Sequence, residues 1–236
     1  MKVLIIQHVD FENPGYFRNL FEAMNAEIAY LNFFEAGYRI TQEFDLLLIM
    51  GGPMNIYEEE KYPWLKEEKA LSRNALEKKK MIIGVCLGSQ LIADALGKRI
   101  YRIPSREIGW FPVRKTHEEV LNFLPEYATV FHWHGESYDI PEACTAFYGT
   151  DLTPNQSFLF DNRVLALQFH MEMTPEGAEM LIENCRDELD GTSYVMSPEM
   201  IMEGFSRYRE SNKKMLRNLV NWLVEKNGFG PGKSQN

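Results

Sequence analysis

Short apolar runs alternate with longer amphipathic runs through the first half of the chain. The runs "KVLII" at residues 2–6, "DLLLIM" at 45–50 and "MIIGV" at 81–85 have the length and apolar character of buried strands. Between them, residues 16–26 and 64–77 carry apolar side chains at roughly helical spacing, which predicts two helices. Strands that alternate with helices are typical of a parallel sheet with crossover helices. The first half of the chain therefore predicts an α/β fold.

Beyond Gly97 the pattern changes to short β-rich runs separated by turn residues. The runs "WFPVRK" (110–115), "TVFHW" (129–133) and "TAFYG" (145–149) indicate strands, and "SFLF" (157–160) with "VLALQFH" (164–170) predicts a hairpin around Asp161-Asn162. The pattern turns helical again at Thr174, which can cap a helix that has Pro175 at its first position. Apolar residues at 216, 219, 220 and 223 predict a last helix whose apolar face packs on the core.

The composition favours one large domain and excludes two kinds of partner. The chain has 236 residues, of which 45% are hydrophobic, so it can bury a sizeable core. We expect a single domain over residues 1–228, with a helical extension over 190–228 and a flexible tail over 229–236. A net charge of −9 argues against a nucleic-acid partner, and no apolar run has the length of a membrane span.

The cysteines favour a reducing compartment. Cys86, Cys144 and Cys185 are odd in number and lack CxxC spacing, which disfavours both a disulfide framework and a thiolate zinc site. The apolar run in "MKVLII" ends at the polar residues Gln7 and His8, too early for a signal peptide. We therefore expect a cytoplasmic protein without a membrane partner.

The segment "GVCLGSQ" at residues 84–90 joins a strand to a helix through a single cysteine. A sharp turn of this kind places Cys86 in a strained backbone conformation, and the close approach of neighbouring segments leaves room only for Gly84 and Gly88 beside it. The turn projects the thiol from the carboxyl end of the sheet and sets it at a helix N-terminus, which favours the thiolate. The segment predicts a nucleophile, and the alternative is a buried cysteine in an ordinary turn.

A base and an oxyanion site can be found for this thiol elsewhere in the chain. In "LALQFHMEM" (165–173), His170 and Glu172 leave the same face of an extended strand, so the carboxylate can orient the imidazole. In "IMGGPMN" (49–55), Gly52 follows a buried strand, and its N–H is a candidate oxyanion donor together with that of Leu87. Taken separately, a strand histidine beside a glutamate or a "GGP" turn can each be purely structural.

Five motifs in this order carry a family resemblance: "GGPMN", "GVCLGSQLIADALG", "HWHGE", "PNQSF" and "QFHMEMTPEG". Over roughly residues 1–185 the chain resembles the class I glutamine amidotransferases, most closely stand-alone proteins similar to the amidotransferase domain of GMP synthase. The resemblance implies a mixed, largely parallel central sheet flanked by helices, flavodoxin-like in layout, with no cofactor. It implies a catalytic triad of Cys86, His170 and Glu172. It also implies that the substrate contacts Gln90 and the backbone around Trp133, His134 and Gly135.

The chain departs from the family pattern at two positions. Met171 stands where the family usually has proline, on the opposite strand face from the triad, and Glu136 stands where aspartate is commoner. The spacing of His132, His134 and Glu136 on one strand face also leaves open a metal site, since two imidazoles and a carboxylate suit zinc. The family resemblance explains the same segment as a substrate wall, so we expect no metal there.

The resemblance implies hydrolysis of the γ-glutamyl amide of glutamine through a γ-glutamyl thioester, with release of ammonia and glutamate. The chain lacks an S-G-G-x-D-S loop for ATP, so the ammonia would pass to a separate synthetase subunit. An alternative is a self-sufficient γ-glutamyl peptidase that acts on small γ-glutamyl peptides or conjugates. A third hypothesis is a binding or regulatory protein that has lost turnover.

Overall fold

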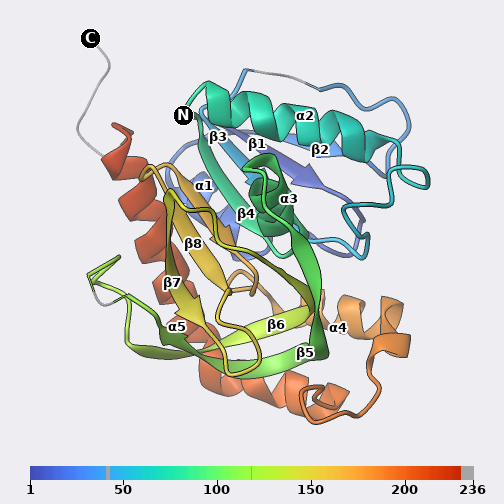
Figure 1. The fold of residues 1–236 in the computed structure, drawn as a ribbon. Helices are drawn as coiled ribbons and strands as arrows, with labels where there is room; N and C mark the ends of the chain where they lie inside the picture. Colours follow the sequence, from blue (N-terminus) through green and yellow to red (C-terminus); the bar gives the residue numbers. More distant parts are fainter. Residues whose placement is uncertain (41–42, 118, 230–236) are drawn as a thin grey trace.

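The computed structural model describes residues 1–40, 43–117 and 119–229 (Figure 1). Its centre is a nine-stranded mixed sheet. The strands are β1 (Lys2–Gln7), β2 (Glu27–Asn32), β3 (Leu46–Ile49), β4 (Met81–Val85), β5 (Ile100–Lys115), β6 (Tyr127–Tyr138), β7 (Cys144–Gly149), β8 (Ser157–Phe160) and β9 (Val164–Leu167). They lie in the order β2-β1-β3-β4-β9-β8-β7-β5-β6 across the sheet.

Parallel pairing joins one half of this sheet and antiparallel pairing the other. Adjacent strands from β2 through β1, β3 and β4 to β9 are parallel to one another. From β9 to β6 the neighbours are antiparallel. The expected hairpin joins β8 and β9, and its turn residues Asp161 and Asn162 have φ values of 48° and 53°, as a tight turn between right-twisted strands requires. The prediction of an α/β fold with a mixed central sheet is confirmed.

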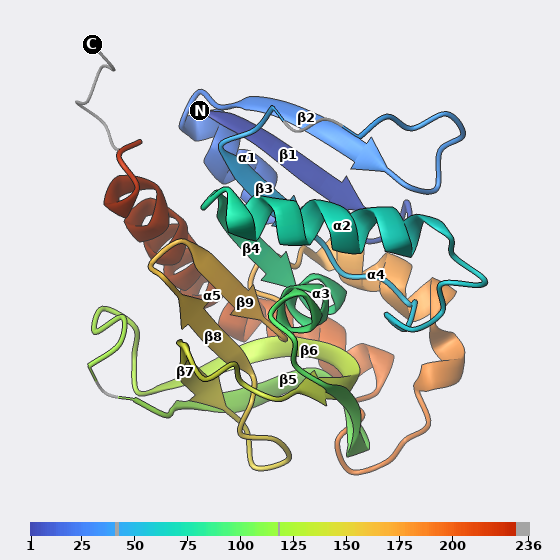
Figure 2. The same cartoon turned by 45° about the horizontal axis from the view of Figure 1, so that its top comes forward.

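Helices cover both faces of the parallel half (Figures 1 and 2). They are α1 (Tyr16–Ala23), α2 (Trp64–Glu77), α3 (Leu87–Ala95), α4 (Pro175–Asn184) and α5 (Pro198–Lys226), with a short 3-10 helix, η1 (Arg186–Glu188). Along β1, Val3 and Ile5 pack with α1 and α5, whereas Leu4 and Ile6 pack with α2 and α3. Because both faces are covered, the strand reads in the sequence as a continuous apolar run.

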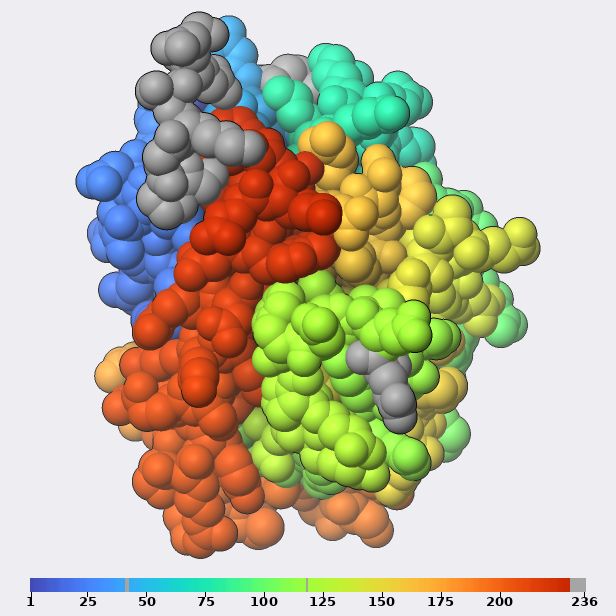
Figure 3. All heavy atoms as spheres, turned by 90° about the vertical axis from the view of Figure 1, so that its left-hand side faces the viewer, coloured from blue at the N-terminus to red at the C-terminus, as the bar shows by residue number. Residues whose placement is uncertain are grey.

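The C-terminal helices begin at the expected kind of cap, and α5 packs an apolar face on the core. The Thr174 hydroxyl accepts a hydrogen bond from the backbone N–H of Gly177, and Ser197 caps α5 in the same way. Figure 3 shows α5 lying between the N-terminal elements, in blue, and the middle of the chain, in green. The predicted apolar stripe of α5 is buried in the core, which confirms its packing role; it comprises Leu216, Leu219, Val220 and Leu223.

Several element boundaries differ from the predictions. Helix α1 ends at Ala23 because Asn25, with φ of 53°, leaves the helical region. Strand β9 ends at Leu167, three residues short of the predicted run, and β5 begins at Ile100, ahead of the predicted one. Apart from Phe229, the expected flexible tail lies outside the described residues. Among the residues described, no helix combines the length and apolar character that crossing a membrane demands.

Candidate active site

Cys86 occupies the turn between β4 and α3, at the carboxyl end of the parallel strands. Its φ of 51° and ψ of −108° are rare for a residue with a side chain. Its backbone N–H donates to the carbonyl of Leu167 at 2.8 Å, and its carbonyl accepts from the Ser89 hydroxyl at 2.7 Å. The neighbouring strand and the first turn of α3 therefore hold the strained residue in place.

The two glycines beside Cys86 are needed because backbones meet there. A Cβ on Gly84 would lie 2.5 Å from the carbonyl group of Gly88. A Cβ on Gly88 would lie 2.2 Å from the carbonyl oxygen of Ile49, on the adjacent strand β3. Neither position has room for a side chain, as the spacing in the sequence predicts.

His170 and Glu172 lie beyond the end of β9, so the prediction that a strand carries them is wrong. His170 instead forms an isolated antiparallel bridge with Phe131 of β6, with N–O distances of 2.7 and 3.3 Å. The Glu172 carbonyl accepts a hydrogen bond from the N–H of Tyr16 at the start of α1. The side chains still meet as expected: His170 Nδ1 lies 2.6 Å from Glu172 Oε1, and both side chains are 2% exposed.

The electrostatics couple His170 to both of its neighbours. Burial lowers the pKa of the imidazole, but Glu172 and Cys86 outweigh burial, so that this pKa lies well above its usual 6.5. Burial raises the pKa of the Cys86 thiol, and His170 is the main group that opposes the rise. The arrangement therefore favours a protonated imidazole beside the sulfur, the partner that a thiolate nucleophile needs.

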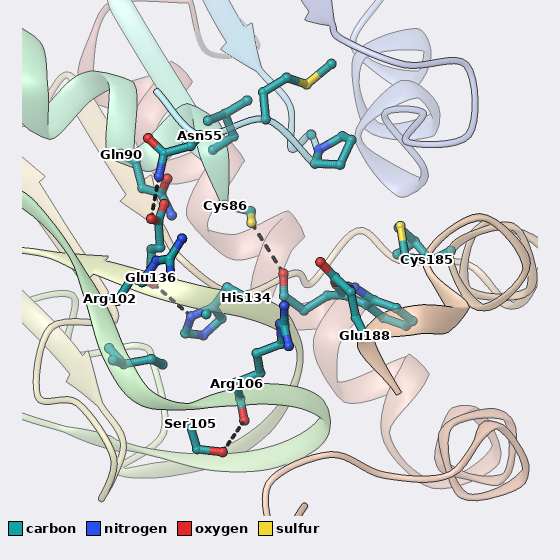
Figure 4. Close-up of a pocket in the computed structure, with 18 of the residues that line it drawn as sticks. Asn55, Cys86, Gln90, Arg102, Ser105, Arg106, His134, Glu136, Cys185 and Glu188 are labelled. Atoms are coloured by element: carbon teal, nitrogen blue, oxygen red, sulfur yellow. Dashed lines mark hydrogen bonds between the residues drawn. The ribbon is translucent and has the colours of Figure 1, made fainter. Parts of the chain in front are cut away.

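Two polar groups contact the sulfur of Cys86. The thiol donates to the carbonyl of Trp133 at 3.6 Å (Figure 4), and the side-chain amide of Gln168 donates to Sγ at the same distance. Gln168 Oε1 in turn accepts from Gln90 Nε2 at 3.2 Å. The role of Gln168 was not predicted from the sequence. Its position two residues before His170, in the same alternating pattern, was the available signal.

The glycine loop after β3 lies beside the nucleophile, as predicted. A Cβ on Gly52 would lie 3.1 Å from both the Leu87 and His8 side chains. The backbone N–H of Leu87 lowers the pKa of Cys86, so it faces the thiol, and the N–H of Gly52 donates to no other described residue. A fully buried ion pair that the sequence did not reveal supports this loop: His8 Nδ1 contacts the Gly51 carbonyl at 2.8 Å, and Nε2 contacts Glu68 at 2.9 Å.

A cavity of about 860 Å³ opens over Cys86. On one side of the sulfur lie Asn55, Gln90, Arg102 and Glu136, and on the other lie Cys185 and Glu188 (Figure 4). All of the predicted oxyanion and substrate residues line this cavity: Gly52, Leu87, Gln90, Trp133, His134 and Gly135. The triad member that lines it is Cys86, whereas His170 and Glu172 line a smaller pocket behind it.

The side of the cavity near Gln90 presents groups of both charges. Asn55 Nδ2 donates to Glu136 Oε1 at 2.5 Å. Burial raises the pKa of Glu136, and the nearby Arg102 guanidinium opposes that rise. A guanidinium and a carboxylate side by side can recognise the carboxylate and ammonium groups of an amino acid.

The groups that converge at β6 are not the His132, His134 and Glu136 set that the sequence spacing left open for a metal. Glu136 accepts a hydrogen bond from Asn55. The carboxylate beside the two histidines is that of Glu107 in β5, which lies 3.3 Å from His134 and 3.8 Å from His132. In the described part of the chain, these three residues are the set whose ligand atoms converge, within 4.8 Å of one another. The pKa of Glu107 falls to about 2 because the histidines outweigh its burial, and burial lowers the pKa of His132 to about 3. An ionised Glu107 carboxylate 3.3 Å from His134 Nε2 can orient that side chain in the cavity wall without a metal.

The fold and this site define the class of protein. The family model "Glutamine amidotransferase class-I" matches residues 9–187, so the chain belongs to that family, as its motifs indicate. The chain is 31% identical over 229 residues to the glutamine amidotransferase-like protein YfeJ of Salmonella typhimurium, covering 92% of this chain and 95% of YfeJ.

Two further comparisons place the chain within the family. It is 29% identical over 163 residues to the GMP synthase (glutamine-hydrolyzing) of Staphylococcus carnosus, which is 67% of this chain but 29% of that enzyme. A solved glutamine amidotransferase from Thermotoga maritima matches with a TM-score of 0.87 and 34% identity, covering 95% of this chain and 98% of the other. The matches to this protein and to YfeJ each cover more than nine-tenths of this chain.

Proposed function

We propose that this protein hydrolyses the γ-glutamyl amide of glutamine through a covalent thioester on Cys86. The observation that supports this most is the placement of Cys86 on a strained turn beside an imidazole that Glu172 holds at 2.6 Å. A nucleophile, a base and an orienting acid in this arrangement are the requirements of acyl transfer through a thiol.

The reaction has two stages. The Cys86 sulfur attacks the amide carbonyl, and the N–H groups of Gly52 and Leu87 stabilise the oxyanion that forms. The carbon–nitrogen bond then breaks while His170 gives its proton to the departing nitrogen, which releases ammonia. In the second stage His170 takes a proton from water, the hydroxide attacks the thioester, and the carbon–sulfur bond breaks to give glutamate and the free thiol.

The glutamyl part of the substrate binds on the side of the cavity near Gln90. Gln90 and the backbone of Trp133, His134 and Gly135 hold the chain of the substrate, next to the Arg102 and Glu136 charges described above. Gln168 accepts a hydrogen bond from Gln90 and donates one to the Cys86 sulfur, so it links this side of the cavity to the nucleophile.

The fate of the ammonia separates two versions of this function. In the first, a separate synthetase subunit receives it; the similarity to part of a GMP synthase supports this version. In the second, the protein is a self-sufficient γ-glutamyl peptidase. The cavity supports the second, because it continues past the sulfur on the side away from Gln90. The three free cysteines agree with a cytoplasmic location for either version.

Glutamate release tests the proposal. The purified protein is incubated with glutamine and with γ-glutamyl dipeptides, beside a Cys86→Ala variant. Release from glutamine that the variant lacks supports the glutaminase, and release from peptides alone supports the peptidase. Covalent labelling of Cys86 by a diazoketone analogue of glutamine, read by mass spectrometry, tests the site when no acceptor subunit is present. Folded protein that neither turns over nor labels would overturn the proposal and favour a binding protein.

A further inference from the structure

A buried carboxyl group that the proposed mechanism does not use lies beside the catalytic histidine. Glu12, in the loop between β1 and α1, is only 9% exposed, and its side chain lines the cavity. Among the described residues it makes no hydrogen bond or ion pair. A Cβ on Gly51 would lie 2.2 Å from Glu12 Oε2 and 3.4 Å from His170 Cε1, so the carboxyl and the imidazole lie against the same backbone position.

A second carboxylate lies on the same side of the cavity. Glu188 of η1 accepts a hydrogen bond from the Trp133 indole at 2.7 Å and lines the cavity near Cys185 (Figure 4). Glu12 and Glu188 both raise the pKa of Cys185, which burial raises most, to about 12, so the two carboxylates are close to one thiol. Two carboxylates therefore face a common space.

Among the described residues that line the cavity, no lysine or arginine pairs with these two carboxylates. The cavity's two arginines are engaged elsewhere: Arg106 lies 3.9 Å from Asp190, and Arg102 lies near Glu136 on the opposite side of the sulfur. The pKa of Glu12 is raised to about 7: burial raises it most, Glu172 and Glu188 add to the rise, and His170 and His8 oppose it. A buried acid of this kind gains most from a ligand that carries positive charge.

The part of the cavity beside Glu12 and Glu188 lies where the leaving group of the substrate would extend. The glutamyl part occupies the side near Gln90, and the nitrogen that departs must be next to His170, which protonates it. Glu12 lies against His170, and Glu188 lies on the side of the sulfur away from Gln90. A leaving group larger than ammonia would therefore extend from the sulfur toward these two carboxylates.

We propose that Glu12 and Glu188 form a leaving-group subsite for a cationic amine, so that the preferred substrate is the γ-glutamyl amide of a diamine or a similarly basic amine. This inference rests on the proposed function and selects its peptidase-like version. The free amino group at the far end of the leaving group binds between the two carboxylates, while the glutamyl group binds near Gln90.

Three γ-glutamyl amides that differ in the charge of their tail test the subsite. Their amines are 1,4-diaminobutane (cationic tail), pentylamine (a neutral tail of the same length) and 4-aminobutyrate (anionic tail). We expect kcat/KM for the cationic amide to exceed that for the neutral one by about 10-fold or more, the value of a hydrogen bond to a charged group. The anionic amide is expected to be the poorest of the three.

Variants assign the preference to the two carboxylates. Glu12→Gln and Glu188→Gln should each lower the ratio of kcat/KM for the cationic to the neutral amide by about 10-fold. Glu183→Gln, which removes the same charge from the exposed side of α4, is the matched control and should leave the ratio unchanged. A wild-type ratio near one, or a ratio that survives in both variants, would overturn the inference.

A binding measurement separates failure of the subsite from failure of the proposed function. Calorimetry with the Cys86→Ala protein compares the uncleaved cationic and neutral amides. Tighter binding of the cationic amide that depends on Glu12 supports the subsite even when wild-type protein cleaves neither compound. Turnover of glutamine with equal binding of both amides would refute the subsite and leave the proposed function standing.

Discussion

Replacing Glu172 tests the coupling between the acid and the imidazole. The side chains of His170 and Glu172 are almost fully buried and 2.6 Å apart, and Glu172 is the principal group that raises the pKa of His170. A hydrogen bond to a charged group contributes about 1.5–3 kcal/mol. In Glu172→Gln and Glu172→Ala proteins, we therefore expect kcat/KM to fall by about 10- to 150-fold. Cys86→Ala should lose all measurable turnover, because it removes the nucleophile itself.

The pH profile gives a readout that a general loss of stability would not change. A raised pKa means that His170 keeps its proton until the pH climbs through that value, which sets the alkaline limb of kcat/KM. Without Glu172, burial lowers the pKa of His170 with less opposition. The alkaline limb should then move down by about one to two pH units, since each unit corresponds to about 1.4 kcal/mol.

The assay compares wild-type, Glu172→Gln and Glu179→Gln proteins, with glutamate release followed across the pH range. Glu179 is exposed on α4 and controls for the loss of one negative charge. Thermal unfolding confirms that each variant is folded. The reasoning is refuted by a folded Glu172→Gln protein whose alkaline limb stays in place, or by a Glu172→Ala protein as inactive as Cys86→Ala.

Two other predictions concern the backbone around the site. Gly88→Ala places a Cβ 2.2 Å from the Ile49 carbonyl, so we expect a loss of about 2 kcal/mol or more in unfolding free energy by urea titration; unchanged stability would contradict the close approach. Glu68→Ala leaves buried His8 without its partner and should cost about 3 kcal/mol, whereas exposed Glu67→Ala should cost little. The pKa of His8 is raised in the folded protein, so the ion pair stabilises the fold fully below about pH 6.5. This stabilisation is lost as the pH rises through the pKa of His8 in the folded protein. The loss of stability in Glu68→Ala should therefore shrink at alkaline pH.

The local features of the site could be predicted from the sequence because their causes are local. The Gly84-Cys86-Gly88 pattern follows from one tight turn, and the Asp161-Asn162 hairpin follows from the positive φ of two adjacent residues. The parallel half of the sheet could be predicted because strands that are covered on both faces consist of continuous apolar runs in the sequence. These features depend on neighbours in the sequence.

The missed features depend on contacts between distant segments. Glu12 and Glu188 are charged residues in a loop and a short helix, where charge usually indicates solvent, and their meeting in one cavity follows from the fold. The same is true of the buried pair His8 and Glu68, which lie 60 residues apart. The strand predicted through His170 failed because its alternating pattern continues after the sheet pairing of β9 stops at Leu167.

The bridge between His170 and Phe131 closes a ring. Strands β9, β8, β7, β5 and β6 are paired in succession, and Phe131 of β6 pairs with His170, three residues beyond the end of β9. The base is thus anchored at both ends of a continuous hydrogen-bonded circuit, while the sulfur belongs to the parallel strands next to it. Opening that circuit anywhere would loosen the imidazole, so the amide proton of His170 should exchange with deuterium as slowly as those of the surrounding strands.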